Sequence, residues 1–219
     1  MIKVKNLHKK YYLGELEIPV LNGIDLEVKE GDYILVTGRS GAGKSTLLYL
    51  IGLLDLPTKG QIFIDKKDVG AYNDKEKSQY RLMNLGYVFQ DYALLPELIA
   101  WENVAVPLIM QGNNKKEAKK IATLALCQVE LEDKIDNLPS QLSGGEQQRV
   151  SIARAIAQKP KILFADEPTA NLDSKTAESV MKVFEKISKN GQTIIMVTHE
   201  TKKATGSNRI INISDGKIK

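Results

Sequence analysis

The stretch Gly38-Arg39-Ser40-Gly41-Ala42-Gly43-Lys44-Ser45 decides how this chain folds, because it fits the pattern G-x-x-x-x-G-K-[ST] of a phosphate-binding loop. In such a loop successive backbone N–H groups surround phosphate oxygens, the lysine neutralises terminal phosphate charge, and the hydroxyl binds magnesium. Glycine is required there, since a Cβ would block the close approach of backbone to phosphate and disfavour positive φ. The stretch therefore predicts a site for a nucleoside triphosphate and Mg²⁺, formed by residues 38–45 together with Thr46.

Both flanks of the loop have the pattern that this motif requires. Residues 33–37 read as a buried strand that enters the loop, and residues 45–54 read as an apolar helix that leaves it. The N-terminus of that helix would face the anion. A glycine-rich turn that binds nothing is the alternative, and the strand, loop and helix together argue against it.

Strand and helix patterns alternate along the rest of the chain. Expected strands at 2–7, 21–28 and 60–64 suggest an antiparallel part beside the loop, and a further strand at 86–90 precedes a helical region. The remaining expected elements are a helix from 150 to 158, a strand at 162–165, a helix at about 176–188, a strand at 193–197 and a last hairpin at 210–216. This order favours an α/β fold: a P-loop NTPase core with a mostly parallel sheet flanked by helices, an N-terminal antiparallel β part and an inserted helical subdomain. We expect one domain over residues 1–219, with its core at about 1–88 and 150–219 and the inserted helical subdomain at about 89–149.

Composition narrows the class of protein. A hydrophobic content of 42% and a charged content of 26% are ordinary for a globular chain, and the single cysteine excludes an intrachain disulfide. The net charge of +4 forms no basic stripe with interleaved aromatics, so nucleic acid is not expected as a ligand. The longest apolar stretch, residues 47–54, is too short to span a membrane, and the N-terminus lacks the apolar block of a signal peptide. We therefore expect a cytoplasmic protein that reaches a membrane only through a partner.

A second nucleotide-site strand ends in two adjacent carboxylates. Residues 162–165 are apolar and lead directly into Asp166 and Glu167. At the end of a strand the chain turns, so both side chains can reach one site. Asp166 is expected to hold magnesium, and Glu167 to orient or polarise the attacking water. An acidic turn without a function is the alternative for the pair taken alone.

The segment Leu142-Ser143-Gly144-Gly145-Glu146-Gln147 supports two compatible interpretations. Ser143 and Glu146 match the capping box S-x-x-E that begins a helix. A helix N-terminus with two glycines and a serine also offers backbone N–H groups to a phosphate.

At this segment the chain resembles the nucleotide-binding subunits of ATP-binding cassette (ABC) transporters, whose signature it reproduces in full. Six specified residues match by chance in on the order of one in a hundred thousand chains. The resemblance covers nearly the whole chain and implies an ATPase that uses ATP and Mg²⁺. It implies nucleotide contacts from Ser143, Gly144, Gly145 and Glu146, and catalytic roles for Lys44, Glu167 and His199.

At four positions the expected role rests on the resemblance alone. Gln90 would sense magnesium and couple to the transporter, and Asp173 would belong to the loop that crosses a dimer interface. His199 would contact the γ-phosphate, and Tyr11 would stack on adenine. Taken singly, each has a plainer interpretation as a surface or packing residue.

The resemblance also implies partners. Members of the family pair head to tail, with two ATP molecules between the phosphate loop of one copy and the signature of the other, and they act on an integral membrane permease. Three stretches look like the lipoprotein-releasing and macrolide-export branch: 55–60, 101–108 and 168–173. Apolar residues at 92–96 and 99–101 fit either a surface for the membrane subunit or core packing.

Other functions remain as alternatives. A cell-division ATPase that regulates a membrane partner is a close relative, and a cassette ATPase of repair or translation is more distant. Repair members would need a long coiled-coil insertion and translation members usually two cassettes, and this chain has neither. An unrelated phosphoryl-transfer kinase would not need the signature.

Overall fold

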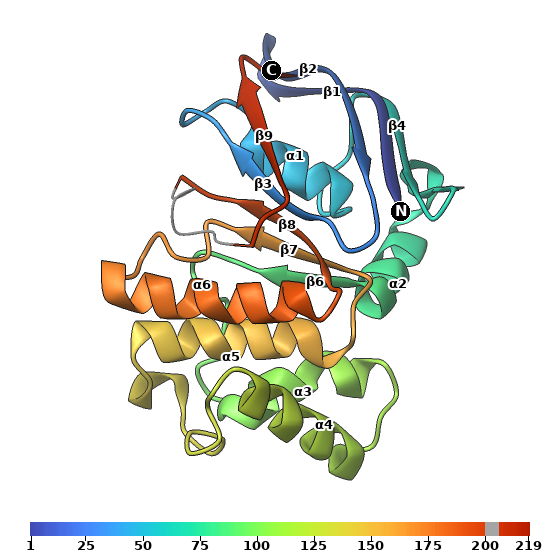
Figure 1. Ribbon diagram of the computed structural model, residues 1–219. Helices are drawn as coiled ribbons and strands as arrows, with labels where there is room; N and C mark the ends of the chain where they lie inside the picture. Colours follow the sequence, from blue (N-terminus) through green and yellow to red (C-terminus); the bar gives the residue numbers. More distant parts are fainter. Residues whose placement is uncertain (200–205) are drawn as a thin grey trace.

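Two sheets, with helices between and below them, make up the architecture in Figure 1, a computed structural model that describes residues 1–199 and 206–219. The smaller sheet is antiparallel and has the strand order β2-β1-β4-β5. Its strands are β1 (Ile2–Leu13), β2 (Leu16–Val28), β4 (Lys59–Ile64) and β5 (Lys67–Asp68). This confirms the antiparallel N-terminal part.

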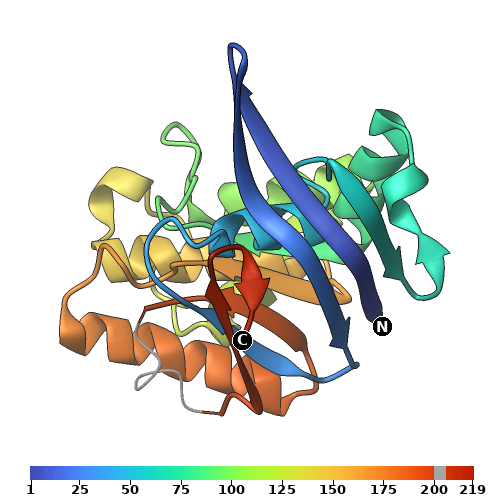
Figure 2. The same ribbon diagram turned by 90° about the horizontal axis from the view of Figure 1, so that it is seen from above.

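The strands β1 and β2 extend farther than the sequence pattern indicated. They continue past the body of the sheet as a hairpin that projects from the molecule (Figure 2). Leu13 pairs with Leu16 across the turn, and Gly14 occupies it with a φ of 60°. Tyr11 pairs with Ile18, so the hairpin carries the residue expected to stack on adenine.

The larger sheet has six strands in the order β10-β9-β3-β8-β7-β6. They are β3 (Tyr33–Thr37), β6 (Leu85–Val88), β7 (Ile162–Asp166), β8 (Thr193–Val197), β9 (Arg209–Ser214) and β10 (Lys217–Ile218). All neighbours from β9 to β6 are parallel, and only β10 runs antiparallel. The mostly parallel sheet is thus confirmed, and β3 and β8 have the predicted bounds.

The helix α1 (Lys44–Ile51) lies between the two sheets (Figure 1). Leu47, Leu50 and Ile51 are fully buried in one apolar cluster with residues of both sheets. The helix ends at Ile51, three residues before the expected position, because Leu53 adopts a left-handed φ of 60°. The apolar contacts with both sheets therefore fix the position of α1.

The opposite face of the larger sheet carries the remaining long helices. The helices α5 (Gly144–Ala157) and α6 (Ser174–Lys189) cover the sheet, and α3 (Ala100–Met110) and α4 (Lys115–Gln128) pack below them (Figure 1). A second apolar cluster joins all four helices to the sheet. Residue 150, where the core was expected to resume after the helical subdomain, lies inside α5, and the division into core and subdomain stays a prediction.

The structure adds a helix that was not expected and decides between two open interpretations. A polar helix, α2 (Asp74–Asn84), was not predicted, and it follows a short 3₁₀ turn, Val69–Ala71. Trp101 is buried in the helical cluster, so for this residue core packing is the correct interpretation. Leu95, by contrast, is exposed.

Candidate nucleotide and magnesium site

The predicted site residues meet at one edge of the larger sheet. The phosphate loop follows β3, His199 follows β8, Asp166 and Glu167 end β7, and Gln90 lies two residues beyond β6. Because these strands are parallel neighbours, all four segments leave the sheet at its carboxyl edge. Ligands of open α/β sheets bind at this edge.

The phosphate loop has the backbone that its glycines permit. Gly38, Gly41 and Gly43 have φ values of 147°, 76° and 98°, in the region that other residues rarely adopt. A Cβ on Gly38 would lie 2.2 Å from the carbonyl oxygen of Ile213, and one on Gly43 would lie 2.7 Å from the Leu21 side chain. The surrounding protein therefore leaves no room for a side chain at Gly38 or Gly43.

The loop is arranged to receive an anion. Gly43 caps α1 and has no side chain that could occupy the N–H groups of the first turn. The ammonium of Lys44 donates a 3.2 Å hydrogen bond to the carbonyl oxygen of Arg39, so it lies over its own loop. Backbone donors, a helix N-terminus and a cation therefore converge at one place.

Ser45 and Asp166 come together although 121 residues separate them. The Ser45 hydroxyl donates a 2.9 Å hydrogen bond to Oδ1 of Asp166. A hydroxyl and a carboxylate are the oxygen ligands that Mg²⁺ prefers. Asp166 also lines a cavity of about 530 Å³ together with Gln90 and Tyr49. Burial and the neighbouring Asp166 raise the pKa of Tyr49, so this phenol stays protonated.

Glu167 and His199 form a pair at the ends of adjacent strands. His199 Nε2 lies 2.9 Å from Oε1 of Glu167. The backbone of Glu167 is left-handed, with a φ of 47°, and its N–H donates to the Val197 carbonyl oxygen at 2.9 Å. Such a conformation is costly for a non-glycine residue and is often found at functional sites. It turns the carboxylate out of the strand direction toward His199.

Gln90 is held by the amide of Asn171, a residue of the stretch 168–173 to which the sequence analysis gave no role. Its Nε2 donates to Oδ1 of Asn171 at 3.3 Å, and Nδ2 of Asn171 donates back to the Gln90 carbonyl oxygen at 3.1 Å. The segment after Gln90 is held as well, because Arg154 donates to the carbonyl oxygens of Tyr92 and Ala93. Tyr92 and Ala93 both have left-handed φ values, of 62° and 48°.

The signature segment caps α5, as predicted. Ser143 and Glu146 form the capping box: the carboxylate of Glu146 accepts from the N–H and the hydroxyl of Ser143 at 2.8 and 2.9 Å. These bonds hold the pKa of Glu146 below its ordinary value. A Cβ on Gly145 would lie 2.2 Å from the Thr176 side chain, so close packing also requires glycine at this position.

Asp173 lies next to the signature. Its carboxylate caps α6 by accepting from the N–H groups of Lys175 and Thr176 at 3.0 and 3.1 Å. The N-termini of α5 and α6 therefore touch through Gly145 and Thr176. Figure 1 places this pair and the phosphate-loop helix α1 on opposite sides of the larger sheet.

Tyr11 lies on β1, and its hydroxyl donates a 2.8 Å hydrogen bond to Oδ2 of Asp55. Asp55 follows α1, so Tyr11 is tied to the same element that begins at the phosphate loop. Burial, followed by the bond to Asp55, raises the pKa of Tyr11. The phenol therefore acts as a hydrogen-bond donor.

Gln148 is a further residue that sequence reasoning missed. It is fully buried, and its Nε2 donates to the carbonyl oxygens of Pro168 at 2.7 Å and Phe89 at 3.3 Å. It thereby joins the signature helix to the segments that follow β6 and β7. Its place directly after the signature was the available signal.

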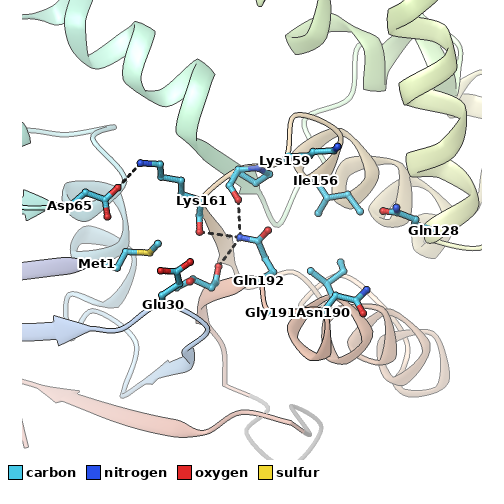
Figure 3. Close-up of a pocket in the computed structure, with 13 residues that line it drawn as sticks. Met1, Glu30, Asp65, Gln128, Ile156, Lys159, Lys161, Asn190, Gly191 and Gln192 are labelled. Carbon is cyan, nitrogen blue, oxygen red and sulfur yellow. Dashed lines mark hydrogen bonds and ion pairs between the residues drawn. The ribbon is translucent and has the colours of Figure 1, made fainter.

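A second cavity, of about 660 Å³, lies at the other edge of the sheet (Figure 3). Lys161 and Thr193 line it at the points where β7 and β8 begin, and the amide of Gln192 donates to the carbonyl oxygens of Pro160 and Lys161. Because nucleotides bind at the carboxyl edge of such sheets, this cavity is not the candidate site.

Comparisons with known proteins agree with this geometry. The family model described as "ABC transporter" matches residues 21–170. The chain is 51% identical over 199 residues to the lipoprotein-releasing system ATP-binding protein LolD of Aquifex aeolicus, which covers 91% of this chain and 89% of that protein. It is 44% identical to the macrolide export ATP-binding/permease protein MacB of Syntrophobacter fumaroxidans, over 100% of this chain and 31% of that protein.

A solved structure is also similar. The dimeric ATP-binding cassette MJ0796, in a post-hydrolysis state bound to ADP and Pi, has a TM-score of 0.92 and 42% identity. The match covers 100% of this chain and 97% of that one. Within the described residues, none of the helices has the length and apolar character needed to cross a bilayer. The chain therefore belongs to the ABC transporter family, as an ATP-hydrolysing subunit with the P-loop fold of an ABC cassette.

Proposed function

We propose that two copies of this chain bind two ATP molecules between them and that hydrolysis powers a membrane permease in lipoprotein release or macrolide-type export. The observation that carries the proposal is the meeting of Ser45 with Asp166 and of Glu167 with His199 at one sheet edge, each pair at 2.9 Å. These pairs provide the separate groups that metal binding and water activation need.

ATP binding rests on the phosphate loop. The N–H groups of residues 39–46 would surround the phosphates, and Lys44 would move from the Arg39 carbonyl oxygen to the terminal phosphate. Tyr11 would stack on adenine. These two contacts would hold the nucleotide at its phosphate end and at its base end.

Magnesium fits the pair formed by Ser45 and Asp166, with Gln90 as a neighbour. A bound Mg²⁺ would neutralise phosphate charge at this place. The hydroxyl of Ser45 donates to Oδ1 of Asp166 at 2.9 Å, so the two oxygen atoms that would bind the ion already lie together. Tyr49, kept protonated beside Asp166, can donate to the carboxylate.

Glu167 would orient the attacking water and accept its proton. The water oxygen forms a bond to the γ-phosphorus, the bond from that phosphorus to the β,γ-bridging oxygen breaks, and ADP and phosphate leave. His199, which pairs with Glu167 in the structure, would then contact the γ-phosphate. Both side chains come from strand ends fixed by the parallel sheet, so their positions need no rearrangement of the core.

The dimer is supported by the placement of the signature. Its helix and α1 lie on opposite sides of the sheet (Figure 1), so one phosphate is approached by both N-termini more readily when they come from different copies. A dimeric relative of the same fold is known. ATP would then be part of the interface, and its hydrolysis would remove contacts that keep the interface closed.

The relatives support the proposal for the membrane partner and the cargo. LolD and MacB are named for lipoprotein release and macrolide export, and this chain covers 89% of the first and 31% of the second. We propose the corresponding arrangement here, a subunit held peripherally on the cytoplasmic face of the membrane by its permease. Copurification with a membrane subunit, and identification of that subunit, tests this part.

The substitution Glu167→Gln tests the catalytic assignment. The amide keeps the shape of the side chain and cannot accept the proton of water. We expect turnover to fall by about 100-fold or more, while ATP still binds and the dimer persists with ATP. Phosphate release measures the first effect, and light scattering of the eluted protein measures the second.

The matched control is Glu178→Gln, on the exposed face of α6, where Glu178 pairs with Lys182. It should change neither turnover nor assembly. Unchanged turnover in Glu167→Gln would contradict the role of Glu167. A variant that binds ATP and stays monomeric would contradict the proposed dimer.

A further inference from the structure

The ring expected to stack on adenine is held by two charged residues to which the sequence analysis gave no role in the site. Tyr11 is surrounded by Lys9 on its own strand and by Asp55 in the loop after α1. A planar base gains from stacking only where the protein ring is already in place. What fixes the Tyr11 ring therefore bears directly on nucleotide binding.

Asp55 is the centre of this cluster. Its Oδ2 accepts from the Tyr11 hydroxyl at 2.8 Å, and its Oδ1 accepts from Nζ of Lys9 at 2.7 Å and from the N–H of Leu56 at 2.6 Å. Burial acts to raise the pKa of Asp55, and the bonds from Lys9, Tyr11 and Leu56 outweigh it, so the pKa lies below its ordinary value. The carboxylate is thus charged and fully engaged at neutral pH.

Lys9 covers one face of the Tyr11 ring. Its ammonium lies 4.7 Å from the ring centroid and also donates to the Leu56 carbonyl oxygen at 2.7 Å. Lys9 is only 8% exposed, whereas Tyr11 is 40% exposed. The ring therefore has one face occupied by a cation and keeps exposed area for a second planar group.

The cluster connects the base end of the site to the phosphate end. Asp55 stands four residues after the last residue of α1, the helix that begins at Lys44. The same loop is fastened to β1 by two bonds of Thr58, whose N–H donates to the His8 carbonyl oxygen at 2.9 Å and whose hydroxyl accepts from the Lys10 N–H at 2.9 Å. The ring is thus held at a fixed separation from the phosphate loop.

We propose that Asp55, assisted by Lys9, is a positioning residue for nucleotide binding that fixes the Tyr11 ring in the place where it stacks on the base. The inference rests on the proposed role of Tyr11 and adds residues that act through it. Neither Asp55 nor Lys9 needs to touch the nucleotide. Because they hold the ring in place beforehand, base binding loses less free energy to ordering the Tyr11 side chain.

Two ligands with equal numbers of phosphates separate the base from the phosphate loop. Binding of ADP and of inorganic pyrophosphate, each with Mg²⁺, is measured by calorimetry on the full chain. Asp55→Ala should weaken ADP about fivefold and leave pyrophosphate within about twofold, because only ADP carries a base. A merely structural defect would lower both affinities together and leave their ratio unchanged.

A double-mutant cycle tests whether Asp55 acts through Tyr11. Tyr11→Ala should weaken ADP about tenfold, and the double variant Tyr11→Ala, Asp55→Ala should bind ADP no more weakly than Tyr11→Ala alone. Tyr11→Phe keeps the ring and removes its hydroxyl, which bonds to Asp55 and to Thr46, so it should weaken ADP by about threefold while Asp55 keeps its ion pair with Lys9. It also serves if Asp55→Ala does not fold.

Asp25→Ala is the matched control, since Asp25 accepts a 3.0 Å bond from the Asn6 N–H in the same sheet and lies away from Tyr11 in the pairing of β1 with β2. It should leave both affinities unchanged. The inference is overturned if Asp55→Ala and Tyr11→Phe preserve the ratio of ADP to pyrophosphate affinity, or if the effects of Tyr11→Ala and Asp55→Ala multiply. If Tyr11→Ala itself preserves that ratio, the stacking role of Tyr11 is wrong and the inference falls with it.

Discussion

Three glycines of the phosphate loop differ in what surrounds them, although all have positive φ. Gly38 has a φ of 147° and faces the Ile213 carbonyl oxygen, whereas Gly41 has a φ of 76° and open space on its Cβ side. Gly38→Ala should therefore destabilise the fold by about 3 kcal/mol or more, and Gly41→Ala by about 1 kcal/mol. Denaturant unfolding of the two variants measures the difference, and equal losses would contradict the close approach of β9 to the loop.

His199 contacts the carboxylate of Glu167, with 2.9 Å between Nε2 and Oε1. His199→Ala removes the contact with Glu167 and the proposed contact with the γ-phosphate, so single-turnover hydrolysis should slow by about 100-fold. ATP affinity should change by less than about threefold, since the phosphate loop is untouched. Rapid-quench phosphate release and nucleotide titration measure the two quantities.

His8→Ala is the control for that substitution, because His8 is the second of the two histidines and bonds only to Asn6 among the described side-chain contacts. It should hydrolyse ATP at the normal rate. A His199→Ala variant with normal single-turnover hydrolysis would leave the pair with Glu167 as a purely structural contact.

At the scale of elements, the start of α5 depends on ionised Glu146. The bonds from Ser143 lower its pKa from the ordinary value of 4.5, so its contribution is present above about pH 4.5 and is lost as pH falls through the lower, folded-state pKa. Glu146→Gln keeps an acceptor and removes the titration. The midpoint of thermal unfolding should therefore fall less steeply in the variant than in the wild type between about pH 5 and pH 3.

The exposed Glu132, which precedes α5 in the same helical region, supplies the control for this comparison. Glu132→Gln should follow the wild-type curve. Parallel curves for all three proteins would show that Glu146 has the same pKa in the folded and unfolded states, against the capping bonds.

The elements that the sequence predicted well are those with a strong local pattern. Strands β3 and β8 are continuous apolar runs, and Ser143 and Glu146 match the capping-box pattern that begins α5. Helix α2 was not predicted because it is polar. Lys77 is its one buried residue, so no apolar periodicity indicates a helix. The full length of the hairpin was not predicted because Leu13 and Leu16, which pair next to its turn, are both exposed to solvent. Gly14 did indicate a turn there.

The candidate site shows the same division. Ser45, Asp166, Glu167 and His199 were found by motif, but the partners Asn171 and Asp55 depend on which strand ends and loops become neighbours. Strand order is a property of the whole sheet, and no local spacing encodes it. Roles taken from the resemblance, such as that of Asp173 at an interface, remain predictions, and the structure adds that Asp173 caps α6.

At the scale of the whole molecule, the central question is whether the phosphate loop and the signature act within one copy or between two. Helices α1 and α5 lie on opposite sides of the sheet, which favours action between copies (Figure 1). Differently tagged copies allow mixed dimers to be purified. In a dimer of Lys44→Ala with Ser143→Arg, one site has two defects and the other joins an intact Lys44 to an intact Ser143.

This mixed dimer should therefore retain ATP turnover that both parent dimers lack, at about half the wild-type rate if the sites act independently. The control places both substitutions in one copy and pairs it with an unaltered copy. Each of its sites then contains one defect, so turnover should be lost although one copy is entirely wild type. The reverse result, an active control and an inactive mixed dimer, would mean that each copy hydrolyses ATP with its own signature, and the head-to-tail arrangement would be wrong.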